Sequence, residues 1–266
     1  MHVRGKWKSA AARRVVEMAG DAATIEEAIA RLANQFLAQV SCPPTDLDDL
    51  RSKLNVELAE SSDVVGSGAL MKEGARYKIV YAADLSPQRR RFTIAHELGH
   101  VIVDAAGPGI PRTGKELERL CDMFASEILM PKRVFLESAS SGVSIKDVFR
   151  LARSFQTSLT STAIRYAQLR RVSVFEVDGP DVVWGRGIIL KGKIRLLDEA
   201  LRELIQEALN GQAGAETLHL NINSDLRLWR VEYHPYGKSR RALILMYPPG
   251  RGAQFPSGDR SEAGGT

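Results

Sequence analysis

Two histidines four residues apart constrain this chain more than any other feature. His96 and His100 enclose Glu97 in the run His-Glu-Leu-Gly-His. Residues at this spacing project from the same face of an α-helix, so the two imidazoles meet only if the segment is helical. An upstream Ser-Pro pair at 86–87 favours a helix start, because Ser caps helices and Pro suits the first helical position. The sequence therefore predicts a helix from there to about residue 107.

Two imidazoles on one helical face can hold a metal ion, with the intervening glutamate beside the position left for water. The alternative is that the histidines only pack or face solvent, which is the usual role of an isolated histidine. Here two of the five histidines take the required spacing with a glutamate between them. We therefore predict zinc as the cofactor, His96 and His100 as ligands, and Glu97 as general base.

Catalytic zinc usually keeps three protein ligands, so one more must come from elsewhere in the chain. Glu118 lies 18 residues beyond His100 on the next predicted helix, where an antiparallel return brings it back to the metal. Asp122 follows one turn later and is predicted to accept the second N–H of a ligating imidazole. Both acids could instead be ordinary surface residues of an amphipathic helix. Cys121 and Asp104 are rival ligands, although a buried core thiol and a polar helix end are the simpler interpretations.

Hydrophobic spacing divides the rest of the chain into helical and extended stretches. Before the histidine helix, the predicted elements are helices at 9–40, with a break at Gly20-Asp21, and at 46–55, then strands and a hairpin between 56 and 82. After it, they are helices at 115–130, 132–139, 144–155 and 158–171, strands at 172–177 and 182–190, a helix at 195–209, and strands at 216–222, 226–234 and 241–247.

Three local details of this pattern lead to expectations of their own. Thr45 is the expected N-cap of the helix at 46–55. Gly66 and Gly68 permit a close approach of the backbone, but turn flexibility is the simpler interpretation. The strand around 68–70 could also pair with an extended substrate backbone.

The composition is that of an ordinary globular chain, with 266 residues, 44% of them hydrophobic and 26% charged. No stretch approaches the roughly 18 consecutive apolar residues of a membrane span, and the N-terminus lacks an apolar segment after its basic residues. We therefore expect no membrane association and a cytoplasmic location. The two cysteines, Cys42 and Cys121, are too few and too far apart for a disulfide scaffold or a Cys-rich zinc finger.

Positive charge is concentrated in residues 131–171. Eight Lys or Arg there face two acidic residues, which gives the segment a net charge of +6 in a chain of net charge +5. Such a surface favours an acidic partner such as nucleic acid, whereas a solvated basic helix face explains it equally well. The basic residues are Lys132, Arg133, Lys146, Arg150, Arg153, Arg165, Arg170 and Arg171, and the acidic ones are Glu137 and Asp147.

The runs RRRFTIAHELGHVIVD and ELERLCDMFASEILMP together resemble the ImmA/IrrE family of bacterial and phage zinc metallopeptidases. The similarity extends from about Pro44 to about Leu169 and includes GSGAL and YKIVYA before the histidine helix and IKDVFRLARSFQTSLTSTAIRYAQL after the second run. This combination of motifs is far more specific than the histidine motif alone.

The resemblance implies a zinc site made by two histidines and a glutamate from the following helix, with the motif glutamate as base. These roles fall on His96, His100, Glu118 and Glu97. The chain departs from the family where Ala-Asn is common and it has Cys-Asp at 121–122, and where His is common and it has Asp at 104. An aspartate at 122 still accepts a hydrogen bond, so its predicted role is retained.

The predicted fold class is α+β. Residues 1–143 are expected to form a mostly helical zincin-like metallopeptidase domain with a small β-sheet, and 144–171 a helix-turn-helix-like segment. A small mixed α/β C-terminal region at 172–249 and a disordered tail at 250–266 would follow. The segment 144–171 either contacts DNA or shapes the substrate cleft by helical packing, and its arginines could instead engage a protein.

Together these features predict a zinc endopeptidase that cleaves a regulatory protein. By resemblance, the substrate is a transcriptional repressor in a stress response or in the switching of a mobile element. The alternatives are a zinc-stabilised DNA- or protein-binding regulator with little peptidase activity, and a toxin-antitoxin component. An intact Glu97 favours the peptidase, because a structural zinc site needs no base there. The donor that stabilises the oxyanion is not distinguished among Tyr77, Tyr81, His219, Tyr233, His234 and Tyr236.

Overall fold

The computed structural model describes residues 7–20, 22–74, 76–105, 114–187, 198–222, 225–237 and 240–250. The chain divides into two compact units, one made of Met1–Ser138 with Arg150–Arg165 and the other of Ala139–Phe149 with Tyr166–Thr266. Helices and small sheets occur together, which confirms the α+β class. No helix within the described ranges is long and apolar enough to cross a membrane. The helix end predicted near 107 and the tail predicted to be disordered after 250 lie outside the described residues.

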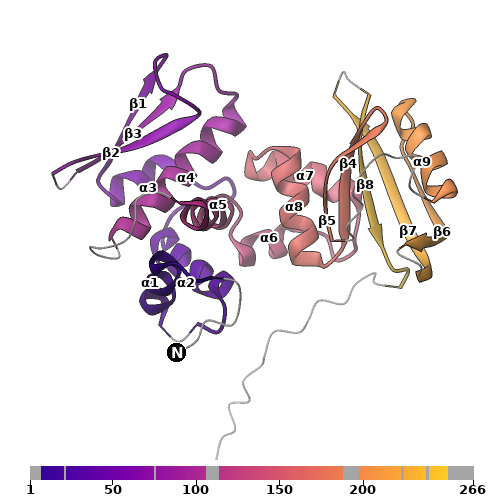
Figure 1. Cartoon of the computed structure of the whole chain (residues 1–266), viewed down its shortest axis with the longest axis horizontal. Helices are drawn as coiled ribbons and strands as arrows, with labels where there is room; N and C mark the ends of the chain where they lie inside the picture. The colour runs from indigo at the N-terminus through magenta and orange to yellow at the C-terminus, as the bar shows by residue number, and fades with distance from the viewer. Residues whose placement is uncertain are drawn as a thin grey trace, which may run out of the picture. The chain divides into compact units, whose positions relative to one another are not determined.

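The first unit surrounds two long helices with shorter ones and a small sheet (Figure 1). The predicted break near Gly20 is confirmed, because this residue ends the first helix with a φ of 59° that favours glycine. The elements that lie wholly in this unit are α1 Ala10–Ala19, α2 Ile25–Leu37, α3 Leu47–Lys53, β1 Val56–Ser61, β2 Gly68–Glu73, β3 Arg76–Ala82, α4 Pro87–Ala105, α5 Lys115–Leu129 and α6 Lys132–Ser138.

The small sheet has the strand order β1-β3-β2, so β2 lies at an edge. Strand β2 pairs antiparallel with β3, which confirms the predicted hairpin, and both strands pack on α4. Gly68 permits this packing, because a Cβ atom there would collide with Cγ2 of Thr93 on α4. The turn interpretation fits Gly66 instead, which has a φ of 87° and open space around it.

The two predicted helix caps have opposite outcomes. Ser86 caps α4 as predicted, with its Oγ accepting a hydrogen bond from the backbone N–H of Arg89 at 3.3 Å. The prediction for Thr45 is wrong, since Asp46 caps α3 by accepting from two backbone N–H groups. Thr45 is fully buried and donates to the carbonyl oxygen of Ile128 at 2.7 Å. A buried carbonyl at the end of α5 needs a donor, and this tertiary contact prevails over the local preference.

Helices α4 and α5 pack closely where Gly99 faces Cys121. A Cβ atom on Gly99 would lie 3.1 Å from Cβ of Phe124 and 3.2 Å from Cα of Cys121, which is tighter than ordinary contact. Cys121 is fully buried there, as its interpretation as a core residue predicted. The missing side chain therefore sets how near α5 approaches α4.

Helices α7 Ile145–Phe155 and α8 Leu159–Arg170 confirm the two helices expected in 144–171, and each contributes to both units. In the first unit, Arg165 of α8 is 6% exposed and forms a buried ion pair with Glu127 of α5. Its guanidinium also donates to the carbonyl oxygen of Met130, with the Nε bond at 3.1 Å. Arg165 therefore joins α8 to α5 inside the unit, although its charge was included in the predicted basic surface.

The second unit contains an antiparallel sheet in the order β5-β4-β8-β7-β6. Helix α9 packs on its β6, β7 and β8 strands through an apolar core that includes Ile205, Val231 and Ile244 (Figure 1). Glu232 of β7 accepts a hydrogen bond from the backbone N–H of Ile145 at 2.8 Å, so it caps the start of α7. The elements are β4 Ser173–Asp178, β5 Asp181–Arg186, α9 Glu199–Leu209, β6 Gly214–Ile222, β7 Asp225–Tyr236 and β8 Arg241–Tyr247.

Candidate metal centre

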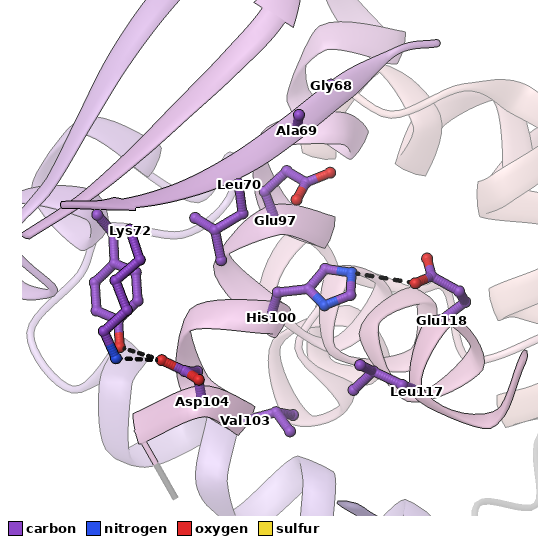
Figure 2. A pocket seen from close by; sticks show the side chains of 11 residues that line it. Gly68, Ala69, Leu70, Lys72, Glu97, His100, Val103, Asp104, Leu117 and Glu118 are labelled. Atoms are coloured by element: carbon purple, nitrogen blue, oxygen red, sulfur yellow. Dashed lines mark hydrogen bonds and ion pairs between the residues drawn. The ribbon is translucent and has the colours of Figure 1, made fainter. Parts of the chain in front are cut away.

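His96, His100 and Glu118 meet between α4 and α5. One donor atom from each lies within 4.8 Å of the others. The Glu118 carboxylate approaches Nε2 of His96 at 3.2 Å and Nε2 of His100 at 3.7 Å, and Figure 2 shows the second of these contacts. In the part of the chain that the structure describes, this is the only group of three or more His, Cys, Asp or Glu residues close enough to hold an ion. The three residues predicted as ligands are thus brought together.

Asp122 orients one of the imidazoles. Its Oδ1 lies 2.9 Å from Nδ1 of His96, while Nε2 of the same ring points toward Glu118. A proton held on Nδ1 by this carboxylate leaves the lone pair of Nε2 for a metal. Burial acts to lower the pKa of His96, but the hydrogen bond to Asp122 and the neighbouring carboxylates outweigh it and raise the pKa.

Glu97 lies beside the predicted ligands, and no described residue forms a hydrogen bond or ion pair with it. The residue is 8% exposed, and burial raises the pKa of its carboxyl group above the ordinary value. In Figure 2 the Glu97 side chain lies below β2, on the same side of α4 as His100, and it lines the same cleft as Glu118. A carboxylate in such a place accepts a proton more readily near neutral pH than an exposed one does.

The two rival ligands are engaged elsewhere. Asp104 accepts hydrogen bonds from Nζ of Lys72 at 2.6 Å and from the hydroxyl of Tyr77 at 2.7 Å, and it is not part of the ligand group. Cys121 is fully buried against Gly99 and, like Asp104, is not part of the ligand group, and burial raises the pKa of its thiol.

A cleft of about 290 Å³ opens on this site from the side of β2. Of the six oxyanion candidates, Tyr77 is the one that lines it. Lys72, Val103 and Leu117 also line the cleft and were not predicted from the sequence. The one available signal was spacing, because Lys72 pairs with Tyr77 across the hairpin. The full lining is Gly68, Ala69, Leu70, Lys72, Tyr77, Glu97, His100, Val103, Asp104, Leu117 and Glu118.

Comparisons with known proteins agree with this geometry. Residues 51–166 match the Peptidase M78 family model, described as IrrE N-terminal-like domain. No curated protein matches the chain significantly. Among solved structures, a Mycobacterium tuberculosis transcriptional regulator is similar, with a TM-score of 0.56 and 14% identity over 82% of this chain and 74% of that chain. A likeness at this identity shows a shared fold.

The family match spans the β2–β3 hairpin, α4 and α5, and so includes every residue of the candidate metal site. The matched range contains the two runs of sequence that carry the His-Glu-x-x-His motif and Glu118. The resemblance to the ImmA/IrrE family is therefore confirmed for residues 51–166, which match the model of the IrrE N-terminal-like domain.

Proposed function

We propose that this chain is a zinc-dependent endopeptidase that cleaves a regulatory protein, namely a transcriptional repressor in a stress response or in the switching of a mobile element. One observation carries the proposal. His96, His100 and Glu118 place their donor atoms within 4.8 Å of one another, and a buried Glu97 shares their cleft. A purely structural metal site has no use for an unpartnered carboxylate at that position.

The donor set fits zinc. Two imidazole nitrogens and one carboxylate oxygen are a common ligand set of catalytic zinc, which keeps a further position open. Asp122 supports this assignment, because it fixes the tautomer of His96 that presents Nε2. A bound zinc ion would supply Lewis acidity toward a water molecule and a peptide carbonyl.

The protein's own contribution is proton transfer and enclosure. Glu97 takes a proton from the attacking water and returns it to the leaving amine, and its raised pKa suits both steps. Leu70, Val103 and Leu117 supply apolar walls that displace water from the cleft. Strand β2 is an edge strand along this cleft, so an extended substrate backbone can add to it by hydrogen bonding.

The central test compares the wild type with Glu97→Gln. Zinc content is measured by elemental analysis, and cleavage is measured on candidate repressors encoded beside this chain. We expect equal zinc and a loss of cleavage of roughly 10²- to 10⁴-fold in the variant, since general-base catalysis contributes about that much. If both proteins bind zinc and neither cleaves, or if both cleave equally, the peptidase mechanism is wrong.

A second test concerns the ligand assignment. Glu118→Ala should lose zinc, whereas Cys121→Ala and Asp104→Ala should retain it. Cys121 is buried and Asp104 is engaged by Lys72, so both variants also control for general disturbance of the two helices. Retention of zinc in Glu118→Ala, with loss in either control, would transfer the third ligand to that control residue.

A zinc-stabilised DNA- or protein-binding regulator is the second candidate. The observation that favours it is the structural similarity to a protein described as a transcriptional regulator. DNA contact through 144–171 would draw on its basic residues, but the buried Arg165 cannot contribute. Arg150 also donates to the carbonyl oxygen of Ser138 at 2.6 Å, and Arg170 to that of Ser140. Salt-dependent DNA binding that is unchanged in Glu97→Gln, without any cleavage, would favour this candidate.

A further inference from the structure

The cleft beside the metal site holds a second polar group that the proposed proton transfer does not use. Lys72, Tyr77 and Asp104 line the same cleft as Glu97 and His100. Nζ of Lys72 and the hydroxyl of Tyr77 both donate to Oδ2 of Asp104, at 2.6 and 2.7 Å. The side chains of Lys72 and Asp104 are 34% and 25% exposed, so the cluster is accessible from the cleft.

Secondary structure fixes how far this cluster lies from the metal ligands. Asp104 follows His100 by four residues on α4, so the two project from one helical face about 6 Å apart along the axis. On the facing strand, Gly68 and Lys72 are four residues apart and therefore share a face of β2. Gly68 packs over α4 near Glu97, whereas Lys72 contacts Asp104. Strand and helix thus run together from the metal site to the cluster.

Apolar side chains line the same cleft, and Leu70 lies between Gly68 and Lys72 on one face of β2. Leu70, Val103 and Leu117 line the same cleft, and Figure 2 shows Leu70 below β2, Val103 next to Asp104 and Leu117 beside Glu118. The cleft thus has apolar lining residues and, about one helical turn from His100, a polar end at Asp104 and Lys72. A substrate side chain that enters the cleft beside the scissile bond would pack its methylene groups, the stem, against these apolar residues. Its terminal polar group, the tip, would then lie at the cluster.

The chemistry of the cluster determines which terminal group of a substrate side chain it can bind. Lys72 has three ammonium N–H donors, and its hydrogen bond to Asp104 favours the charged form. Asp104 already accepts from two donors, and a cationic tip would have to compete with Lys72 for it. A tip that carries oxygen acceptors can instead receive a hydrogen bond from the ammonium group without breaking the cluster.

We propose that Lys72 is a specificity-determining residue that selects a substrate side chain with an apolar stem and an oxygen-acceptor tip, glutamine or glutamate, next to the scissile bond. The inference rests on the proposed peptidase function, because it assumes that the substrate lies along β2 beside the metal. It goes further by naming the class of residue that the cleft takes. Tyr77 and Asp104 act as positioning residues, since they hold the ammonium group at the end of the cleft.

The test uses zinc-loaded protein and two independent readouts. The first is the dissociation constant of the α-hydroxamates of Glu, Gln, Leu and Lys, measured by calorimetry, since the hydroxamate group binds zinc without any turnover. The second is the set of sites cleaved in a peptide mixture derived from a proteome, identified by mass spectrometry. Both are measured on the wild type, Lys72→Met, Lys72→Glu and the control Lys78→Glu, whose residue lies on β3 and does not line the cleft.

In the wild type we expect the Glu and Gln hydroxamates to bind more tightly than the Lys hydroxamate. In Lys72→Met that preference should fall about tenfold, which corresponds to one lost charge-assisted hydrogen bond. In Lys72→Glu it should reverse toward Lys, and Lys78→Glu should resemble the wild type. Cleavage sites should shift in the same direction.

The outcomes separate this inference from the proposed function. Cleavage with an unchanged profile in Lys72→Glu, or hydroxamates bound without preference, overturns the role of Lys72 and leaves the peptidase intact. The expected hydroxamate preference without cleavage of any peptide supports the role of Lys72 and overturns the peptidase. Absence of hydroxamate binding to zinc-loaded protein overturns the inference, because the cluster then does not adjoin an accessible metal.

Discussion

Two glutamates that are buried to nearly the same degree have opposite surroundings in this molecule. Glu97 on α4 is 8% exposed and Glu127 on α5 is 5% exposed. Glu127 pairs with Arg165 through one oxygen and accepts from the backbone N–H of Lys132 at 2.8 Å through the other. Among the described residues, no hydrogen bond or ion pair holds the carboxylate of Glu97, and burial raises its pKa.

The difference separates a carboxylate that stabilises the fold from one that is proposed to transfer a proton. A buried charge is costly unless it is paired, and Glu127 meets that requirement while it joins α5 to α8 and caps the start of α6. The desolvation of Glu97 is left uncompensated in the protein alone, which favours a group that exchanges a proton. Burial by itself therefore does not distinguish the two glutamates; burial without a partner, beside the candidate ligand group, is the combination on which the proposed role of Glu97 rests.

The largest expected effect is on stability at Glu127. Glu127→Ala leaves the buried guanidinium of Arg165 without its counter-ion, so we expect the free energy of unfolding to fall by about 3–5 kcal/mol. Glu97→Gln should show no loss, because it removes an unpaired charge. Urea unfolding of metal-free protein at pH 7 measures both. The double variant Glu127→Met with Arg165→Leu is the control and should recover most of the loss. Equal destabilisation by Glu97→Gln and Glu127→Ala would contradict the conclusion that only Glu127 stabilises the fold.

A smaller effect is expected on zinc affinity at Asp122. Removal of a carboxylate that orients a ligating imidazole typically costs 10- to 100-fold in metal affinity, so Asp122→Ala should weaken zinc binding by about that factor. Its side chain is 57% exposed, so unfolding of the metal-free protein should change by less than about 0.5 kcal/mol. Competition with a chromogenic chelator measures the affinity. Unchanged zinc affinity in Asp122→Ala would show that His96 is oriented without this carboxylate.

The sequence predicted which candidate ligands come together better than it predicted their surroundings. His96 and His100 follow from helical geometry, and Glu118 required only that α5 return along α4, which the structure places as expected. The N-cap at Thr45 was mispredicted because a buried carbonyl 83 residues away takes its hydroxyl. No local pattern encodes such a contact, since it depends on how the helices pack.

The basic segment shows the same limit. Composition alone gives 131–171 a net charge of +6 and suggests one positive surface. Arg165 is instead buried against Glu127, a residue outside the segment that sequence spacing does not connect with it. A net charge calculated from the sequence includes every charged residue, whether or not the fold buries it. The cluster of Lys72 and Asp104 was missed for the same reason, because its members come from a strand and a helix that meet only in the folded unit.

The smallest expected effect concerns Gly99, where the helices that carry the two glutamates meet. In Gly99→Ala the new Cβ would lie 3.1 Å from Cβ of Phe124, so α5 must move by a few tenths of an ångström. Overpacking costs about 1–3 kcal/mol, and alanine restores about 1 kcal/mol of helix propensity, so the net loss of stability should be about 1 kcal/mol. Since Glu118 moves with α5, zinc affinity should also fall.

A matched glycine separates this effect from a general one. Gly142→Ala adds a Cβ that meets nothing within 4 Å, so neither stability nor zinc affinity should change by more than a small amount. The informative quantity is the loss of zinc affinity in Gly99→Ala relative to its loss of folding stability. A loss of stability with unchanged zinc affinity would mean that Glu118 reaches the metal from a flexible position, and the close approach of α4 and α5 would then stabilise the fold without setting the site.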